Sequence, residues 1–139
     1  MRISTKGEYG LKAMLDLALH HDRVPIQIRE VAERQGIPQR YLEQLLLRLR
    51  QEGLVVSQRG AAGGYGLSRP PGRITVAEII AALEGPIRIV THKKGGSRDV
   101  FSALWEDVEG AIGDVLRISL EDLIARKAKL ERGAMVYHI

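Results

Sequence analysis

Four polar side chains that could hydrogen-bond to base edges gather in one short segment, about residues 39–51. The leucines of this segment recur at three- and four-residue spacing and predict a helix with one buried face, formed by Leu42, Leu45, Leu46 and Leu49. The start of the opposite face then presents Gln39, Arg40, Glu43 and Gln44. Glutamine suits adenine, arginine suits guanine, and glutamate can accept from the amino group of cytosine. Periodicity alone fits a solvated helix face equally well.

A glycine-rich segment follows, in which Arg59 is flanked by Gly60, Gly63 and Gly64. Glycine permits tight turns and a close approach of the backbone to a partner. An arginine at such a tip could enter a minor groove or clamp a phosphate. A phosphate-cradling nucleotide loop is the alternative, but no helix follows the glycines, as that kind of loop requires.

Two further helices are predicted upstream, over about 5–20 and 28–35, to position the polar segment. Thr5 and Glu8 have the spacing of a capping box at the first helix start. The turn over 36–38 is short enough for a helix-turn-helix at about 28–51. Short strands flank the glycines and predict a β-hairpin wing over about 54–68. The expected fold is therefore mainly α with a small hairpin, a winged helix-turn-helix.

The second half of the chain, 74–139, is predicted to be helical around one loop. Thr75 and Glu78 open a helix to about Leu83, residues 88–99 lack helical periodicity, and helices follow over about 100–117 and 119–131. The longer helix carries an apolar stripe made of Phe101, Leu104, Trp105, Val108, Ile112, Val115 and Leu116. Such a stripe could pair two chains as a C2 homodimer, or it could pack within one chain.

The charge is divided unevenly between the halves. Residues 1–73 hold 12 Lys and Arg against 7 Asp and Glu, whereas residues 74–139 hold 9 against 10. An excess of positive charge confined to 1–73 indicates a DNA-binding domain there. The apolar stripe indicates a dimerisation region in 74–139. Phosphate contacts are expected from Arg2, Lys6, Tyr41, Arg48, Arg50, Ser57, Gly60, Gly63 and Gly64. For the charged members of that set, an ordinary surface role is an equal alternative.

Several function classes are disfavoured by composition. The 139 residues contain no cysteine, so they offer no disulfide, thiolate metal site or cysteine nucleophile, and the four histidines have no ligand-like spacing. No nucleophile–base pair or carboxylate pair indicates an enzyme. No apolar run is long enough to span a membrane, and no secretory signal precedes the first helix, so a cytoplasmic location is expected.

Together these motifs resemble the Rrf-two (Rrf2) family of bacterial transcription regulators, over roughly residues 1–131. The resemblance is carried by the segments 1–11, 41–46, 53–55, 59–65, 79–85, 104–105 and 119–123. It implies a homodimeric repressor that binds a palindromic promoter site in double-stranded DNA. It also implies that Glu43 discriminates between bases and that Arg59 is the minor-groove residue of the wing.

The resemblance departs from the iron–sulfur members of the family at the cofactor site. Those members hold a cluster with three cysteines before the dimerisation helix, whereas residues 85–104 here contain none. A histidine ligand of the IscR branch corresponds to Ser102, and His92 has no partner ligands. We therefore expect no cluster and no other cofactor. The cysteine-free loop is similar to the CymR branch, which implies control of sulfur or cysteine metabolism. That branch also implies the alternative of a protein-interaction module regulated through an enzyme such as O-acetylserine sulfhydrylase.

Overall fold

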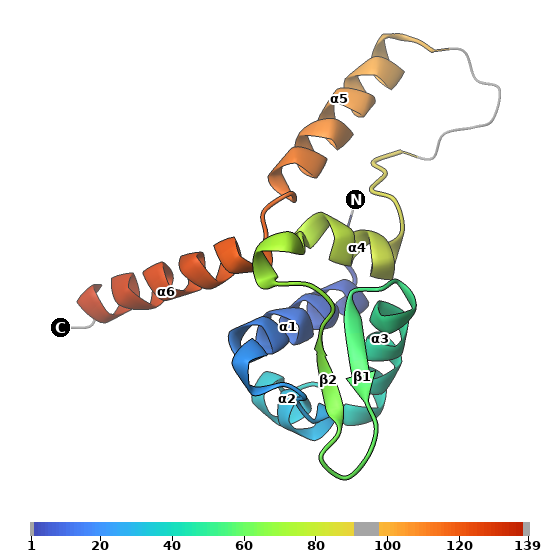
Figure 1. Cartoon of the computed structure of the whole chain (residues 1–139). Helices are drawn as coiled ribbons and strands as arrows, with labels where there is room; N and C mark the ends of the chain where they lie inside the picture. The colour runs from blue at the N-terminus through green and yellow to red at the C-terminus, as the bar shows by residue number, and fades with distance from the viewer. Residues whose placement is uncertain (1, 91–97, 138–139) are drawn as a thin grey trace.

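The computed structural model describes residues 2–90 and 98–137. It contains six α-helices and one antiparallel hairpin, in the order α1 (Thr5–Leu19), α2 (Ile28–Gln35), α3 (Gln39–Gln51), β1 (Val55–Gln58), β2 (Gly64–Leu67), α4 (Val76–Glu84), α5 (Val100–Val115) and α6 (Leu120–Tyr137), with 3₁₀ turns at His21–Arg23 and Pro71–Arg73. Figure 1 shows α1–α4 and the hairpin as one body from which α5 and α6 extend. The predicted winged helix-turn-helix architecture is confirmed.

Helix α1 lies at the centre of the body, in contact with α2, α3, α4 and α6. Its Met14 and Leu17 are fully buried, together with Leu42, Leu46 and Leu49 of α3. Burial of this apolar surface is the main term that holds the helix-turn-helix together. Leu19, the last residue of α1, is exposed.

The turn between α2 and α3 is set by two residues. Gly36 takes the left-handed conformation, with φ at 64°, which favours glycine because it has no Cβ. Ile37 follows and is buried in the core. Gly36 therefore redirects the chain between α2 and α3, and Ile37 packs the turn against the core.

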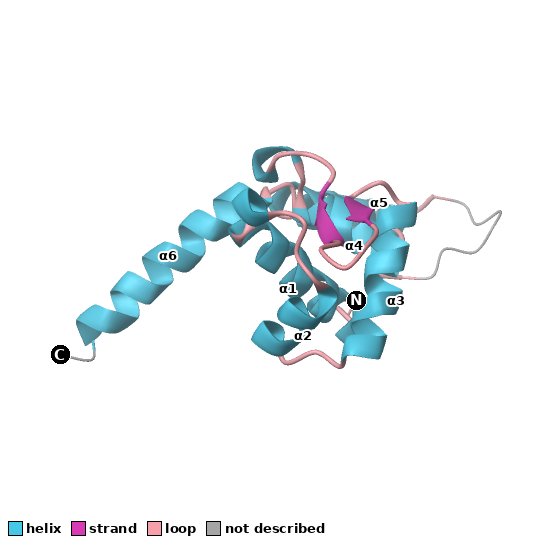
Figure 2. Cartoon of the chain, turned by 60° about the horizontal axis from the view of Figure 1, so that its bottom comes forward, coloured by secondary structure: helices cyan, strands magenta, loops and turns pink. Residues whose placement is uncertain are grey.

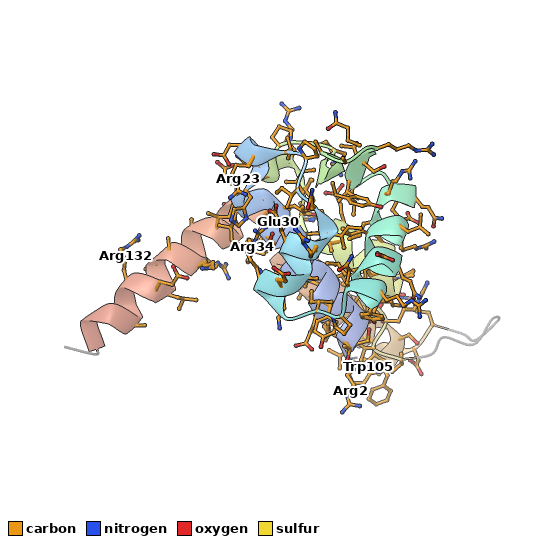
Figure 3. All side chains as sticks on the ribbon, turned by 90° about the horizontal axis from the view of Figure 1, so that it is seen from below. Arg2, Arg23, Glu30, Arg34, Trp105 and Arg132 are labelled. Atoms are coloured by element: carbon orange, nitrogen blue, oxygen red, sulfur yellow. The ribbon has the colours of Figure 1, made fainter. Side chains whose placement is uncertain are left out.

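A buried carboxylate fixes α2 against α1. Asp16 is only 1% exposed, and it accepts two hydrogen bonds from Arg34, at 3.0 and 2.8 Å, and one from Gln35 at 2.9 Å. The hydrogen bond to Asp16 raises the pKa of Arg34 above its ordinary value. Arg34 also pairs with Glu30, which Arg23 reaches from the other side (Figure 3). This network fixes where α2 lies on α1.

The first helix begins one residue earlier than the predicted capping box requires. Ser4, not Thr5, is the N-cap, and its hydroxyl accepts from the amide of Gly7. The partner carboxylate is Glu84 at the end of α4, whose Oε1 accepts from the amides of Ser4 and Gly7, both at 3.1 Å, and from the Ser4 hydroxyl. A residue 80 positions away therefore takes the place expected for Glu8. The Thr75–Glu78 capping box of α4 is present as predicted.

The core continues past residue 73. Ile74, Ile79 and Leu120 are fully buried in the same cluster as α1–α3. The chain between α5 and α6 is also bonded to the start of α4, through Val76 N to the Ile118 carbonyl at 2.9 Å and Leu120 N to the Ile74 carbonyl at 3.0 Å. Helix α6 continues to Tyr137, beyond the predicted end near 131. None of the described helices is long and apolar enough to cross a membrane.

Candidate nucleic-acid interface

A groove of about 530 Å³ lies between the hairpin, the start of α2 and α3. The hairpin tip and α2 lie at the end of the body opposite the N-terminus, as Figure 1 shows. Seven residues of the predicted interface line this groove: Gln39, Arg50, Ser57, Arg59, Gly60, Gly63 and Gly64. The remaining lining is Gln27, Ile28, Arg29, Gln58, Ala61 and Tyr65. Segments from four parts of the sequence thus form one concave surface.

The lining of the groove contains three arginines and no acidic residue. Arg29, Arg50 and Arg59 are exposed, and among the described residues no carboxylate oxygen lies within 4.0 Å of their charged atoms. Four other arginines of the body, Arg23, Arg34, Arg48 and Arg69, pair with carboxylates, as Arg69 does with Glu78 at 2.9 Å. Unpaired guanidinium groups on an exposed concave surface create a positive field that attracts phosphate.

Glycine is required in the wing for two separate structural reasons. Gly60 has φ at 108°, a left-handed backbone that side chains rarely allow. A Cβ on Gly63 would lie 2.2 Å from the carbonyl oxygen of Gln58, and one on Gly64 would lie 2.2 Å from that of Ile26. Only Gly60 is therefore needed for the turn itself, whereas Gly63 and Gly64 allow close backbone packing.

The wing is fixed to the segment that leads into α2. Ile26 and Tyr65 exchange two backbone hydrogen bonds of 2.8 Å. They form an isolated antiparallel bridge that joins the segment before α2 to β2 of the hairpin. The side-chain amide of Gln27 donates to the carbonyl of Ala61 in the tip, at 3.3 Å. The tip that carries Arg59 is thus positioned relative to the helix-turn-helix and not left as a free arm.

Helix α3 presents its predicted base-reading residues to solvent. Gln39, Arg40, Glu43 and Gln44 are all exposed, opposite the buried leucines. Of these four, only Gln39 lines the groove, and the other three lie on the outer face of the helix. Their roles as base contacts remain predictions.

Four other predicted phosphate contacts lie elsewhere. Tyr41 is half-buried and packs edge-on against Tyr9, with ring centroids 5.8 Å apart. Arg48 donates to the Ala82 carbonyl of α4 at 3.0 Å and pairs with Glu52. Arg2 lines a separate cleft with Glu84 and lies away from the wing, on the side of Trp105 (Figure 3), and Lys6 lies in the nearby first turn of α1. The structure does not bring these four residues to the groove.

Gln27 and Arg29 belong to the groove but not to the predicted set. Both lie at the start of α2, beside the tip of the wing. A weak signal is present in the sequence, since Arg29 falls outside the buried positions Val31 and Ala32 of a helix-turn-helix. The tertiary contacts between this segment and the wing, Ile26 with Tyr65 and Gln27 with Ala61, place Arg29 in the same groove as Arg59.

The apolar stripe of α5 is left uncovered in the single chain. No residue of α5 is buried; Phe101 is 62% exposed and Val115 is 71% exposed. Leu104 is also exposed, while Trp105, Val108, Ile112 and Leu116 are half-buried. Figure 2 shows α6 extending from the body in another direction, so it does not cover this stripe.

An iron–sulfur cluster does not fit the residues present. The chain provides no thiolate, and the described residues contain no group of three His, Asp or Glu arranged to hold a metal ion. Ser102 instead donates from its amide and hydroxyl to Asp99, at 2.8 and 2.9 Å, and so takes part in the N-cap of α5. His92 and the rest of 91–97 lie outside the described residues.

Comparison with known proteins agrees with this architecture. The family described as "Rrf2: Iron-dependent Transcriptional regulator" matches residues 3–126. The HTH-type transcriptional regulator IscR of Xenorhabdus nematophila is 44% identical over 137 residues, covering 94% of this chain and 84% of that protein.

Two solved structures share both the fold and the sequence pattern. CymR of B. subtilis, described as its global cysteine regulator, has a TM-score of 0.81 at 41% identity and covers 91% of this chain and 98% of that one. IscR of T. potens has a TM-score of 0.78 at 43% identity, covering 91% and 88%. These relatives are transcriptional regulators rather than enzymes, as the sequence predicts. The chain belongs to the Rrf2 family of DNA-binding transcriptional regulators.

Proposed function

We propose that this chain is a homodimeric repressor that binds a near-palindromic promoter site in the cytoplasm and does so without an iron–sulfur cluster. The observation that carries the proposal is the groove next to the outer face of α3. Within the described part of the chain, its lining has no acidic residue and its three arginines have no carboxylate partner. Contacts between arginine side chains and DNA phosphates fix the position of a protein on a duplex, and side chains on a recognition helix read the bases. The groove supplies the first kind of contact and Gln39, Arg40, Glu43 and Gln44 supply the second.

The homodimer is supported by the uncovered stripe of α5. A helix with no buried residue gains little from folding unless another surface covers it. A second copy of the same helix provides a matching apolar stripe, and a two-fold axis then relates two reading heads. Heads that meet successive major grooves are about 34 Å apart, and the two-fold axis that relates them calls for a palindromic site.

A role in sulfur or cysteine metabolism is the pathway we propose. It is supported by the likeness to CymR, described as a global cysteine regulator, and by the absence of cysteines that a cluster would need. The second candidate is a regulator that acts through an enzyme such as O-acetylserine sulfhydrylase, for which exposed α5 and α6 offer surface. Pull-down with that purified enzyme, with and without operator DNA, separates the two, because only the second requires a stable complex.

The main test is selection of bound DNA from a random duplex pool, followed by anisotropy titration of the recovered site. We expect a near-palindrome bound with an affinity of about 10⁻⁸ M or tighter, and a binding constant that falls steeply with salt. The protein should be purified without oxygen, and its visible absorption recorded beside the titration. Recovery of no consensus, or binding that is insensitive to salt, would refute the proposal. A cluster spectrum that tracks DNA binding would refute its cluster-free part.

A further inference from the structure

Leu47 is an apolar residue in the middle of a polar helix face. The buried leucines of α3 are 42, 45, 46 and 49, so at 100° per residue the centre of the opposite face falls close to Arg40 and Leu47. Leu47 is 48% exposed. Its neighbours on this face are Arg40, Glu43, Gln44, Arg50 and Gln51, and each of them is exposed.

The other large exposed apolar residues of the described chain lie on different surfaces. Val100, Phe101, Leu104 and Val115 belong to α5, and Leu130 belongs to α6. Val56 is part of the wing, and Val24 lies beside it. Ile3 lies just before the start of α1, and Leu19 is its last residue. Within α3, Leu47 is the single large exposed apolar side chain. It therefore does not extend the proposed dimer surface, and its surroundings point to the same partner as the polar residues around it.

We propose that Leu47 is a specificity residue that contacts the C5 methyl group of a thymine in the major groove. This inference rests on the proposed function, because it requires α3 to lie in that groove. An isobutyl group can neither donate nor accept a hydrogen bond, so it cannot read the polar edges of bases. The methyl group of thymine is the apolar feature that the major groove presents, and apolar side chains recognise it.

The helix geometry also predicts how far that thymine lies from the base that Glu43 contacts. Leu47 follows Glu43 by four residues and Gln44 by three, which corresponds to a rise of about 6 Å and 4.5 Å along α3. Stacked bases are about 3.4 Å apart. The thymine should therefore lie within about two base pairs of the base that Glu43 contacts.

The test uses the selected operator, with deoxyuridine replacing thymine at one position at a time. Deoxyuridine lacks only the C5 methyl group, so every hydrogen bond of the base pair is kept. For the wild-type chain we expect one position per half-site at which the replacement weakens binding about fourfold, the effect of exposing one methyl group. Leu47→Ala should lose this sensitivity and bind both duplexes equally, whereas Leu47→Met, which keeps an apolar side chain, should retain it. The matched control is Leu19→Ala, which removes a 38% exposed leucine from the end of α1 and should leave the sensitivity unchanged.

Three outcomes would overturn the inference while leaving the proposed function intact. One is a selected site without thymine near the position read by Glu43. Another is a wild-type chain that tolerates deoxyuridine at every position. The last is a Leu47→Ala chain that keeps the full sensitivity, analysed as a double-mutant cycle between protein and DNA. Failure to bind any selected DNA is a different result, because it refutes the proposed function itself.

Discussion

Glu43 is the only carboxylate within α3, and it lies exposed on the outer face of a helix that we propose enters DNA. A negative charge near phosphates is unfavourable unless it accepts a hydrogen bond from a base such as cytosine. Glu43→Ala should therefore weaken binding to the preferred site by about 1–3 kcal/mol and leave binding to random DNA unchanged or tighter. Repeating the selection with this variant measures the effect. Glu33→Ala, an exposed change on α2, is the control, and an unaltered consensus in Glu43→Ala would contradict the assigned role.

We expect Arg29 to contribute to the affinity of the protein for DNA and not to its preference for a particular DNA sequence. It lines the groove without a carboxylate partner among the described residues, so it is available to phosphate. Arg29→Ala is expected to weaken binding to all sequences to a similar degree. The slope of log K against log salt should fall by about 0.9 for each phosphate that is no longer neutralised, or by about 1.8 for a dimer. Arg23→Ala is the matched control, because Arg23 is already paired with Glu30 at 3.5 Å. An equal slope in both variants would place Arg29 outside the interface.

Some features of single residues could be predicted from the sequence, and others could not. The exposure of Gln39, Arg40, Glu43 and Gln44 could be predicted, because the leucine period of α3 fixes which face is buried. The burial of Asp16 could not, since the partner that compensates its charge is Arg34, on another helix. The place of Arg29 in the groove could not be predicted for a similar reason, because its relation to Arg59 depends on the bridge between Ile26 and Tyr65.

At the scale of the element, the wing depends on Gly64. A Cβ there would lie 2.2 Å from the Ile26 carbonyl oxygen, an atom that cannot move without breaking its bond to Tyr65. Gly64→Ala should cost about 1–3 kcal/mol of stability, and it should weaken DNA binding because the tip is displaced. Urea unfolding and anisotropy measure the two effects. Gly133→Ala is the control, since its Cβ would meet nothing within 4 Å. Equal stability of the two variants would show that the wing is not held at this point.

The junction of α1 and α4 should be sensitive to acid through Glu84. The hydrogen bond from the Ser4 hydroxyl, with those from the amides of Ser4 and Gly7, holds the pKa of Glu84 below its ordinary value, although partial burial acts in the opposite direction. A lowered pKa in the folded state means that the carboxylate stabilises the fold above about pH 4.3, the ordinary value for Glu, and that this contribution is lost as the pH falls through the folded-state pKa. The stability difference between wild type and Glu84→Gln should therefore shrink between neutral and acid pH. Urea unfolding at several pH values measures it, and a difference independent of pH would exclude this role.

The elements themselves could be predicted to different degrees. Helices α2 and α3 have the predicted bounds, because Gly36, Pro38 and Gly53 mark their ends locally. The start of α1 lies at Ser4 since its cap includes Glu84, a tertiary contact that a local motif cannot reveal. Helix α6 runs on to Tyr137 through Gly133, where the local sequence predicts an end near residue 131.

At the scale of the whole molecule, α1–α4 bury a shared core while α5 buries none of its residues. Beyond α4, the first turn of α6 is the exception, because Leu120 is fully buried in that core. Helices α5 and α6 are thus held to the body at the ends where they meet, and they are exposed along most of their lengths. This division suits a protein in which one part binds DNA and the other pairs two copies.

The single tryptophan of the chain, Trp105, lies within the apolar stripe of α5 and reports on that pairing. In a homodimer its indole should be covered, and dilution should move its emission to longer wavelength as monomers form and water reaches it. Leu104→Glu places a charge in the stripe and should give a folded monomer by sedimentation, with the red-shifted emission at all concentrations. That monomer should also bind the palindrome much more weakly, since it has a single reading head. Glu106→Lys, a charge change away from the stripe, should stay dimeric because its exposed pair with Arg98 contributes little. A Leu104→Glu chain that remains dimeric would mean that the two copies associate through another surface.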